Sequence, residues 1–395
     1  MLFIDKTIID CIVKCTEAEA RNKLSDETWK TSNEEIYKLI GVMIARGLLV
    51  KGLSTDETWS TTWGPPFFRQ ALSRGRYKEL ISFIRFDMRS TRSERLHTEK
   101  FALVLYVWNH FIENCKSHYN PHEDITIDEQ LFPTKARYPF TQYIASKPDK
   151  FGIKFWLAAD VQSKYCLNGF PYLGKDDHRP SDQTLSEHVV LKLMEPFLGG
   201  GHNVTTDNFF TSVKLGQKLA NKKTSIVGTV NHIRREVPPQ IKSCKKPLYS
   251  STILKSNNMT LTVYQSKPSK NVLVLSTVHR SVAIAEGKKK LPETIVYYNA
   301  TKYGVDVLDQ MARLYTSKVS SRRWPLQVFY NVFDLAGINS WIVYKEATGL
   351  KISRRAFLLQ LVTELQLRDD IGGNSSSHDD STNEEEVVEA PKVRQ

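Results

Sequence analysis

Cysteine and long apolar segments are both scarce in this sequence. Five cysteines in 395 residues are an odd and sparse set, and the N-terminus has no secretory signal pattern. Together these features exclude a secreted fold held by disulfides and indicate reduced thiols in the cytosol or nucleus. The best apolar run, residues 39–49, is interrupted by Arg46, and a membrane-spanning helix needs roughly 20 apolar residues. We therefore expect no membrane partner.

Paired zinc-ligand spacing is also lacking. Cys115, His118 and His122 lie close together in the sequence, but Pro121 and the missing second cysteine pair spoil the usual ligand pattern. We interpret these residues as structural.

Acidic residues are too few to balance the basic ones. The chain has 55 Lys and Arg against 43 Asp and Glu, a net charge of +12. Six of the acids but only two of the bases lie in residues 371–395, so residues 1–370 carry +16. A body this positive attracts polyanions, because each neutralised phosphate releases condensed counterions. Nucleic acid is therefore the expected partner class; charge alone would also allow an anionic membrane surface, which ranks second and is not the expected partner.

The first part of the chain, residues 1–123, is predicted to be helical. Ser32 and Glu35 have the spacing of a capping box before an apolar-periodic run at 36–50. Residues 101–115 repeat apolar side chains at helical spacing.

From residue 124 the periodicity changes to that of strands and then alternates. Strands are predicted at 125–131, 153–161 and 165–173, followed by a helix at 185–198 that a Thr184/Glu187 capping box opens. A strand at 203–206, a helix that Thr211 caps, and a strand at 225–230 complete the series. This order predicts a mixed sheet over 124–232, with an antiparallel meander and two right-handed crossovers.

The rest of the chain is predicted to hold one insertion, further helices and a tail. Residues 233–293 are basic and form a β-rich insertion with strands at 259–265 and 271–278. Helices are predicted at 305–315, 326–348 and 354–367. Residues 371–395 are rich in Ser, Asn and acids, so we expect a disordered acidic tail. The fold class is therefore α/β.

Three aspartates stand where ligands are expected. Asp128 lies within the first strand, Asp207 follows a short strand directly, and Asp306 shares a helix face with Asp309. Phosphodiester cleavage needs an activated oxygen nucleophile and a neutralised leaving oxygen, and two Mg²⁺ ions held by carboxylates provide both. The spacing alone also allows a simpler interpretation, in which Asp207 is a turn residue and Asp306 favours the positive end of its helix.

The segments around these acids resemble those of the piggyBac-type transposases. The matching segments, in order, are Ile127-Asp128-Glu129-Gln130-Leu131, Pro139-Phe140, Ser146-Lys147-Pro148, Phe151-Gly152-Ile153-Lys154, Asp207-Asn208-Phe209-Phe210-Thr211-Ser212, Tyr297-Tyr298-Asn299, Gly304-Val305-Asp306-Val307-Leu308-Asp309-Gln310-Met311 and Arg323-Trp324-Pro325. The resemblance implies a ribonuclease H-like catalytic core in residues 124–232, with its third acid in 294–316. It also implies helical dimerisation and DNA-binding segments at 1–123 and 317–370.

The same resemblance implies cut-and-paste DNA transposition. The expected steps are nicking at the element ends, hairpin formation by the freed 3′ hydroxyl and joining at TTAA. Asp128, Asp207 and Asp306 would be the catalytic, metal-binding acids and Asp309 an accessory acid. The implied cofactor is a pair of Mg²⁺ ions, with Mn²⁺ as a substitute. The implied partner is double-stranded DNA, both transposon ends and target, bound by a homodimer in the nucleus.

Departures from the family pattern motivate a second hypothesis. Lys135-Ala136-Arg137 stands where the family has Arg-Gly-Arg, and the given sequence has an acidic tail where members often carry a Cys/His-rich end-recognition domain. It also begins almost directly at the helical unit. The alternative is a host-adopted, catalytically silent DNA-binding protein derived from such a transposase, although the intact acids favour the enzyme.

Basic and aromatic residues supply candidate DNA contacts. The set comprises Lys135, Arg137, Arg234, Arg235, Arg322, Arg323 and Trp324. Guanidinium groups bind phosphate, and an indole beside them can stack on an unpaired base. The competing interpretations are solvated surface charges and, for Trp324, a core residue at a helix start.

Overall fold

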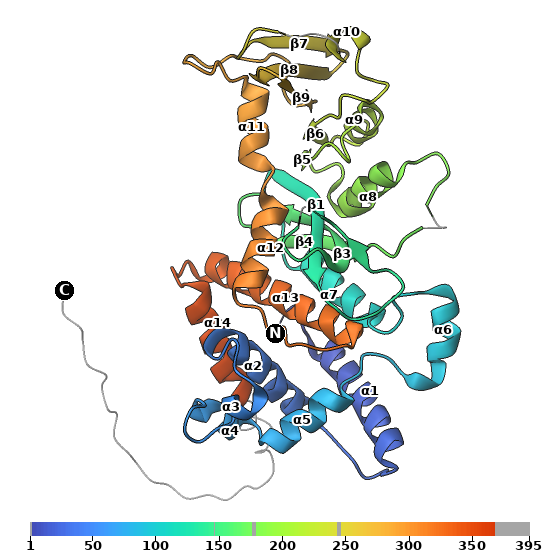
Figure 1. Cartoon of the computed structure of the whole chain (residues 1–395), viewed down its shortest axis with the longest axis vertical. Helices are drawn as coiled ribbons and strands as arrows, with labels where there is room; N and C mark the ends of the chain where they lie inside the picture. Colours follow the sequence, from blue (N-terminus) through green and yellow to red (C-terminus); the bar gives the residue numbers. More distant parts are fainter. Residues whose placement is uncertain (1, 146, 176–178, 243–245, 368–395) are drawn as a thin grey trace, which may run out of the picture.

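The computed structural model describes residues 2–145, 147–175, 179–242 and 246–367. The predicted tail at 371–395 and Ser146 of the matching segments lie outside the described residues. A long sheet stands on a base of packed helices (Figure 1). Over the described ranges, no helix is long and apolar enough to cross a membrane.

Helices from both ends of the chain build the base. They are α1 (Lys6–Leu24), α2 (Asn33–Leu49), α3 (Thr55–Thr58), α4 (Pro66–Ala71), α5 (Arg74–Phe83), α6 (Arg92–Thr98), α7 (Leu105–Ser117), α13 (Trp324–Thr348) and α14 (Arg354–Gln366), with the 3₁₀ turn η1 (Arg89–Thr91). α14 packs against α2, and α13 packs against α7 (Figure 1).

One predicted cap is only half formed. The Ser32 hydroxyl accepts a hydrogen bond from the Glu35 N–H, as expected. The Glu35 carboxylate, however, forms an ion pair with Arg76 at 2.6 Å and accepts a hydrogen bond from the Thr31 hydroxyl at 2.6 Å. A partly buried guanidinium is a stronger partner than the backbone N–H of the N-cap, so the capping box is not closed.

The sheet has the predicted order of strands and helices in its first part. The elements are β1 (Asp124–Pro133), β2 (Gln142–Tyr143), β3 (Phe151–Asp160), β4 (Cys166–Pro171), α8 (Leu185–Met194), η2 (Glu195–Phe197), β5 (Asn203–Thr206), α9 (Val213–Ala220) and β6 (Ser225–Thr229). β3 pairs antiparallel with β1 and β4, whereas β1, β5 and β6 run parallel. The α/β class and the mixed sheet are therefore confirmed.

The two predicted helix caps of this region differ in outcome. The Thr184/Glu187 capping box is present, with both reciprocal hydrogen bonds. Ser212, not Thr211, caps α9. The Thr211 hydroxyl instead donates to the Asp207 carbonyl at 2.7 Å, because residues 207–211 form their own turn before the helix begins.

The β-rich insertion continues the main sheet. Its elements are α10 (Pro239–Lys242), β7 (Ser251–Ser256), β8 (Met259–Lys267) and β9 (Lys270–Ser276), of which β7 was not predicted. β9 pairs antiparallel with β6, which gives the strand order β2-β3-β1-β5-β6-β9-β8-β7, with β4 beside β3. The insertion is thus hydrogen-bonded to the strand next to β5.

Two helices lead from the insertion back to the base. They are α11 (Glu293–Thr301) and α12 (Gly304–Leu314), and α12 packs on β1. The largest buried apolar cluster runs from Phe3 to Leu365 and includes residues of β1, α12 and α13. Two smaller clusters contain alternate residues of β8 and β9 and so lie on the two faces of these strands. The helical base and the sheet therefore share one core.

Close packing of α2 on the loop after α12 depends on Gly47. A Cβ added at Gly47 would overlap the carbonyl of Thr316, whereas one added at Gly75 in α5 would meet nothing within 4 Å. We predict that Gly47→Ala lowers the free energy of unfolding by about 1–3 kcal/mol, the usual cost of overpacking. The matched control, Gly75→Ala, should raise it by up to about 1 kcal/mol through helix propensity. Urea titration measures both, and equal effects would contradict the packing argument.

Candidate active site

Parallel pairing of β1 with β5 places two of the predicted acids next to each other. Ile127 is in register with Thr206, so Asp128 and Asp207 are the next residues along the two strands. Asp128 accepts a hydrogen bond from the Glu129 N–H at 2.8 Å, and Asp207 accepts one from the Phe209 N–H at 2.9 Å. Each carboxylate is thus oriented by a backbone N–H group one or two residues after it.

α12 brings the third acid to the same edge. Gly304 starts this helix so close to β1 that an added Cβ would lie 2.8 Å from the Thr126 hydroxyl oxygen. That hydroxyl donates to the Thr301 carbonyl at 2.6 Å, which ties the end of α11 to β1. Asp306 lies in the first turn of α12 and its side chain is about half exposed.

The carboxylates at this edge repel one another. Burial raises the pKa of Asp128 well above its usual range, and the negative charges of Glu129, Asp207 and Asp306 raise it further. Burial also raises the pKa of Asp207, with Glu129 adding to the shift and the Phe209 N–H opposing it. Four acids therefore share one electrostatic environment.

Two lysines, not singled out from the sequence, border this cluster. Lys147 Nζ lies 3.9 Å from an Asp306 oxygen and donates to the Glu129 carbonyl at 3.4 Å. Lys154 Nζ lies 3.7 Å from the centroid of the Trp156 ring, and burial lowers the pKa of Lys154. Glu129, Lys147 and Lys154 all lie within the matching sequence segments, which was the signal available for finding them.

The donor set fits a hard divalent cation in its chemistry. Asp128, Asp207 and Asp306 supply carboxylate oxygens, which Mg²⁺ prefers. Burial and neighbouring negative charge raise the pKa values of Asp128 and Asp207, and a bound cation would favour their ionised forms. Within the described ranges, no three side chains of His, Cys, Asp or Glu lie close enough to one another to form a metal site.

Asp309 lies on the same helix but has other partners. It accepts hydrogen bonds from Gln130 Nε2 and Arg313 Nε, both at 3.1 Å. Gln130 in turn accepts one from Asn331 Nδ2 at 2.8 Å. Burial raises the pKa of Asp309, with Arg313 as the main opposing charge. Asp309 therefore connects α12 with β1 through Gln130, and Gln130 connects in turn with Asn331 of α13.

Arg234 contacts the turn that holds Asp207. Its guanidinium donates to the carbonyls of Phe209 at 2.8 Å and Asn208 at 3.3 Å. Arg235 beside it is exposed. The sequence predicted a DNA contact for both, whereas the structure shows the Arg234 side chain bound to the protein's own backbone.

Arg323 and Trp324 are also engaged inside the protein. Arg323 donates to the carbonyls of Ile81, Ser82 and Ile84 at the end of α5, and burial lowers its pKa to about 10. Trp324 packs on Phe101 at a centroid distance of 5.4 Å. In this structure the Arg323 guanidinium has three carbonyl partners and the Trp324 ring lies in an aromatic cluster, and the DNA contacts expected of these two residues stay predictions. Arg322, Lys135 and Arg137 are exposed.

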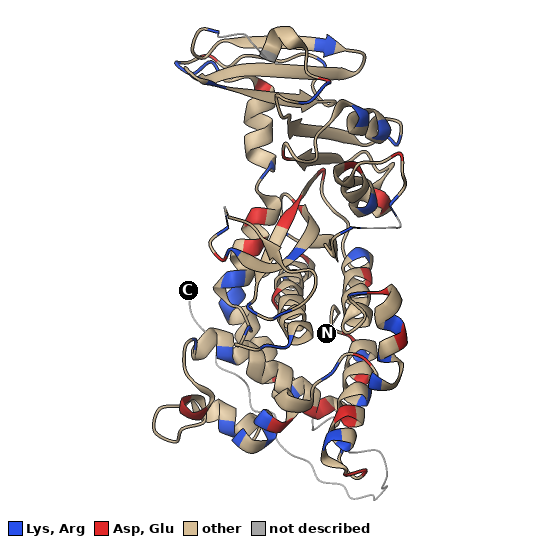
Figure 2. Cartoon of the chain, turned by 45° about the vertical axis from the view of Figure 1, so that its right-hand side comes forward, with Lys and Arg blue, Asp and Glu red and all other residues tan. Residues whose placement is uncertain are grey.

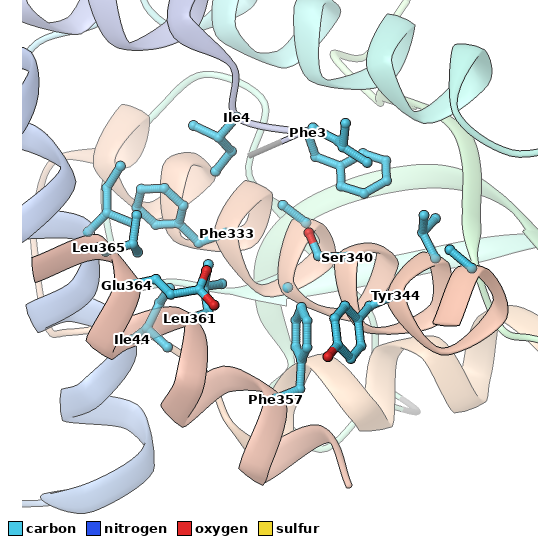
Figure 3. A pocket seen from close by; sticks show the side chains of 16 residues that line it. Phe3, Ile4, Ile44, Phe333, Ser340, Tyr344, Phe357, Leu361, Glu364 and Leu365 are labelled. Atoms are coloured by element: carbon cyan, nitrogen blue, oxygen red, sulfur yellow. The ribbon is translucent and has the colours of Figure 1, made fainter. Parts of the chain in front are cut away.

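An apolar cavity of about 340 Å³ lies in the helical base and not among these acids. Side chains from the N-terminal segment, α2, α13 and α14 converge on it, including Phe3, Ile44, Phe333 and Phe357 (Figure 3). Its lining contains one carboxylate, that of Glu364, and none of the predicted site residues. We assign it no part in the chemistry.

Comparison with known proteins agrees with the fold. Residues 1–341 match the family described as Transposase IS4. The chain is 23% identical over 373 residues to the human PiggyBac transposable element-derived protein 3, covering 87% of this chain and 60% of that protein. It is 23% identical to the human Chimeric ERCC6-PGBD3 protein, of which it covers 34%. The chain thus spans less than two thirds of the length of either relative.

A solved structure is similar over almost the whole chain. It is the cryo-EM structure of the piggyBac transposase synaptic complex with hairpin DNA, with 34% identity and a TM-score of 0.87. The match covers 95% of this chain and 81% of that chain. The chain therefore belongs to the transposase family described as Transposase IS4. Within that class it is of the piggyBac type, as the sequence segments predicted, and its sheet is the ribonuclease H-like core.

The raised pKa of Asp128 predicts a pH-dependent stability. The folded protein binds a proton at Asp128 more readily than the unfolded chain, so ionisation at pH values above the folded pKa costs stability. This cost vanishes as the pH falls below the unfolded pKa of about 3.9. Without divalent metal, Asp128→Asn should therefore raise the Tm at pH 8, by an amount that shrinks toward pH 4.

Asp56 provides the control for this measurement. It is exposed, and its hydrogen bond with Lys78 lowers its pKa, so Asp56→Asn should leave the Tm at pH 8 unchanged or slightly lower. Thermal unfolding followed by circular dichroism gives both values. A lower Tm for Asp128→Asn at pH 8 would contradict the proposed repulsion.

Proposed function

We propose that this chain is a cut-and-paste DNA transposase of piggyBac type that cleaves and joins phosphodiester bonds through Asp128, Asp207 and Asp306. The observation that supports this best is the shared edge of β1, β5 and α12, where burial and the neighbouring carboxylates, Asp207 and Asp306 among them, raise the pKa of Asp128. Acids with this mutual repulsion are typical of functional sites. Family membership supplies the reaction class.

The three aspartates are the residues that would hold Mg²⁺, with Mn²⁺ as a substitute. Bound there, a pair of ions supplies an activated oxygen nucleophile and neutralises the leaving oxygen. The protein's own part is to fix the carboxylates: backbone N–H groups orient Asp128 and Asp207, and α12 carries Asp306. Lys147 and Lys154 limit the net negative charge beside them.

Double-stranded DNA is the proposed substrate, as transposon ends and as a TTAA target. The described body is basic, and Lys and Arg occur from the β7–β9 end of the sheet to the helical base (Figure 2). The similar solved structure is of a synaptic complex with hairpin DNA. A homodimer that brings two ends together, working in the nucleus, completes the proposal. Arg235, Arg322, Lys135 and Arg137 are the exposed candidates for phosphate contact.

Cleavage of TTAA-flanked end DNA tests the proposal directly. Wild-type protein should give nicked and strand-transferred products with Mg²⁺ and none with EDTA. Asp207→Asn should reduce the product by roughly a hundredfold or more, the scale of losing one charged group that stabilises a transition state. Asp56→Asn, which removes an exposed acid far from the site, should retain activity. Products are measured on denaturing gels with end-labelled DNA.

The competing function is DNA binding without cleavage. The observation that favours it is that Lys135-Ala136-Arg137 stands where the family has Arg-Gly-Arg. Salt-sensitive binding by wild type and Asp207→Asn alike, with no Mg²⁺-dependent product from either, would replace the transposase proposal with this one.

Two adjacent arginines allow the positioning of Asp207 to be tested apart from DNA contact. Arg234 holds the Asp207 turn, whereas Arg235 is exposed. Arg234→Ala should therefore raise the Mg²⁺ concentration needed for half-maximal nicking by roughly tenfold or more, the usual effect of losing a group that orients a metal ligand. Arg235→Ala should leave that concentration unchanged and weaken DNA binding in a salt-dependent way. Identical behaviour of the two variants would reject the positioning role of Arg234.

A further inference from the structure

A second cavity, of about 600 Å³, lies on the α8 side of the sheet. Its walls come from the end of β4 and the residues after it, from α8, from the start of α7 and from the segment before α7. None of the sequence-predicted site residues lines it. Its volume is typical of a site for one small organic group.

The register of the sheet places this cavity level with the acids. Glu129, the residue after Asp128, is paired with Trp156 on β3, and Trp156 is paired with Phe170 on β4. Both Trp156 and Phe170 line the cavity. β4 is two strands from β1, a separation of roughly 10 Å. This corresponds to about three steps of a DNA strand at 3.4 Å each.

A pair of stacked rings connects the cavity with the Asp207 turn. Phe209, two residues after Asp207, is 43% exposed. Its ring lies almost parallel to that of Trp156, with centroids 5.7 Å apart. Trp156 also lines the cavity. The exposed Phe209 ring beside the Asp207 turn is therefore stacked on a buried ring that lines the cavity.

Aromatic side chains form the back of the cavity. Trp156, Phe170 and Tyr172 line it from neighbouring strands, and the rings of Trp156 and Tyr172 meet edge to face at 6.0 Å. Phe170 and Tyr172 are only partly buried. Every nucleobase has a π-face that stacks on such rings, whatever its identity.

The polar groups of the cavity favour an anionic ligand with hydrogen-bond acceptors. Lys192 Nζ lies 4.4 Å from the Phe170 centroid, and Lys100 Nζ donates to the Leu173 carbonyl at 3.4 Å. The single carboxylate of the lining, Glu99, accepts a hydrogen bond from the Phe101 N–H. The fully buried Trp156 indole N–H has no partner within the described ranges.

We propose that this cavity binds one unpaired nucleotide of the DNA next to the cleavage site. The base stacks against Phe170 and Tyr172, and its phosphate lies by Lys100 and Lys192. Stacking on these rings needs a base face that no neighbouring pair covers, so the ligand is a single strand or an extrahelical base. This inference rests on the proposed function for the source of the DNA, but the binding itself needs neither metal nor cleavage.

Oligonucleotide binding in EDTA tests the subsite apart from catalysis. The probe is an eight-nucleotide thymidine strand with 2-aminopurine at its centre, whose fluorescence falls when the base stacks. Wild-type protein should quench it. Tyr172→Leu should weaken binding roughly 5- to 100-fold, the range for losing one stacked base. Lys192→Gln and Lys100→Gln should weaken it severalfold, and Lys100 is exposed, so its loss spares the fold.

Lys222→Gln is the matched control, since it removes the same charge from an exposed position outside the cavity. Equal weakening by Lys222→Gln, or full binding by both lysine variants of the cavity, would overturn the proposal. So would a blunt duplex that binds with the same dependence on Tyr172, because its bases are paired. Nicking is measured in parallel: normal nicking with cavity-independent binding rejects the subsite alone, and cavity-dependent binding without nicking rejects the transposase alone.

Discussion

Mutual repulsion among carboxylates at one edge of a sheet is the constraint on which the rest of this structure depends. Burial raises the pKa of Asp128, and the negative charges of Glu129, Asp207 and Asp306 raise it further, so the cluster tends to take up a proton. The backbone prevents these carboxylates from moving apart, because each one is carried by an element that is packed against the others. Parallel pairing fixes Asp128 beside Asp207, and the close approach at Gly304 fixes the helix of Asp306. The large shared core beneath them offsets the cost.

A second layer of polar contacts surrounds this edge and explains several residues of the matching segments. Asp309 connects α12 to Gln130, Gln130 connects to Asn331 of α13, and Arg313 donates to the Leu131 carbonyl. These contacts are buried or nearly so, where an unpaired polar group is costly. Arg234 and Arg323 likewise donate hydrogen bonds to backbone carbonyls, Arg234 in the Asp207 turn and Arg323 at the end of α5. In this basic protein, guanidinium groups therefore hold backbone segments in place in addition to contributing positive charge.

Much of the fold and of the candidate site follows from sequence because it depends on local patterns. Alternation and capping residues located β1, β5 and α8, and they placed Asp128 within the first strand and Asp207 directly after a short one, as the structure has them. Partners chosen across long sequence separations were not predictable. Nothing around Arg323 indicates that its guanidinium binds carbonyls about 240 residues earlier. Nor does the sequence of 271–278 show that β9 pairs with β6 rather than forming a separate sheet.

The single core also sets the order in which this chain can fold during synthesis. α13, about 37 Å long at 1.5 Å per residue, packs against α7 and contributes residues that are buried with those of α1, α2 and the sheet. Until residues up to 365 have left the ribosome, α2 lacks α14 and α7 lacks α13. Domains elsewhere fold one after another as they emerge. Here the core shared by the first helices and the sheet is complete only after α13 and α14 have emerged.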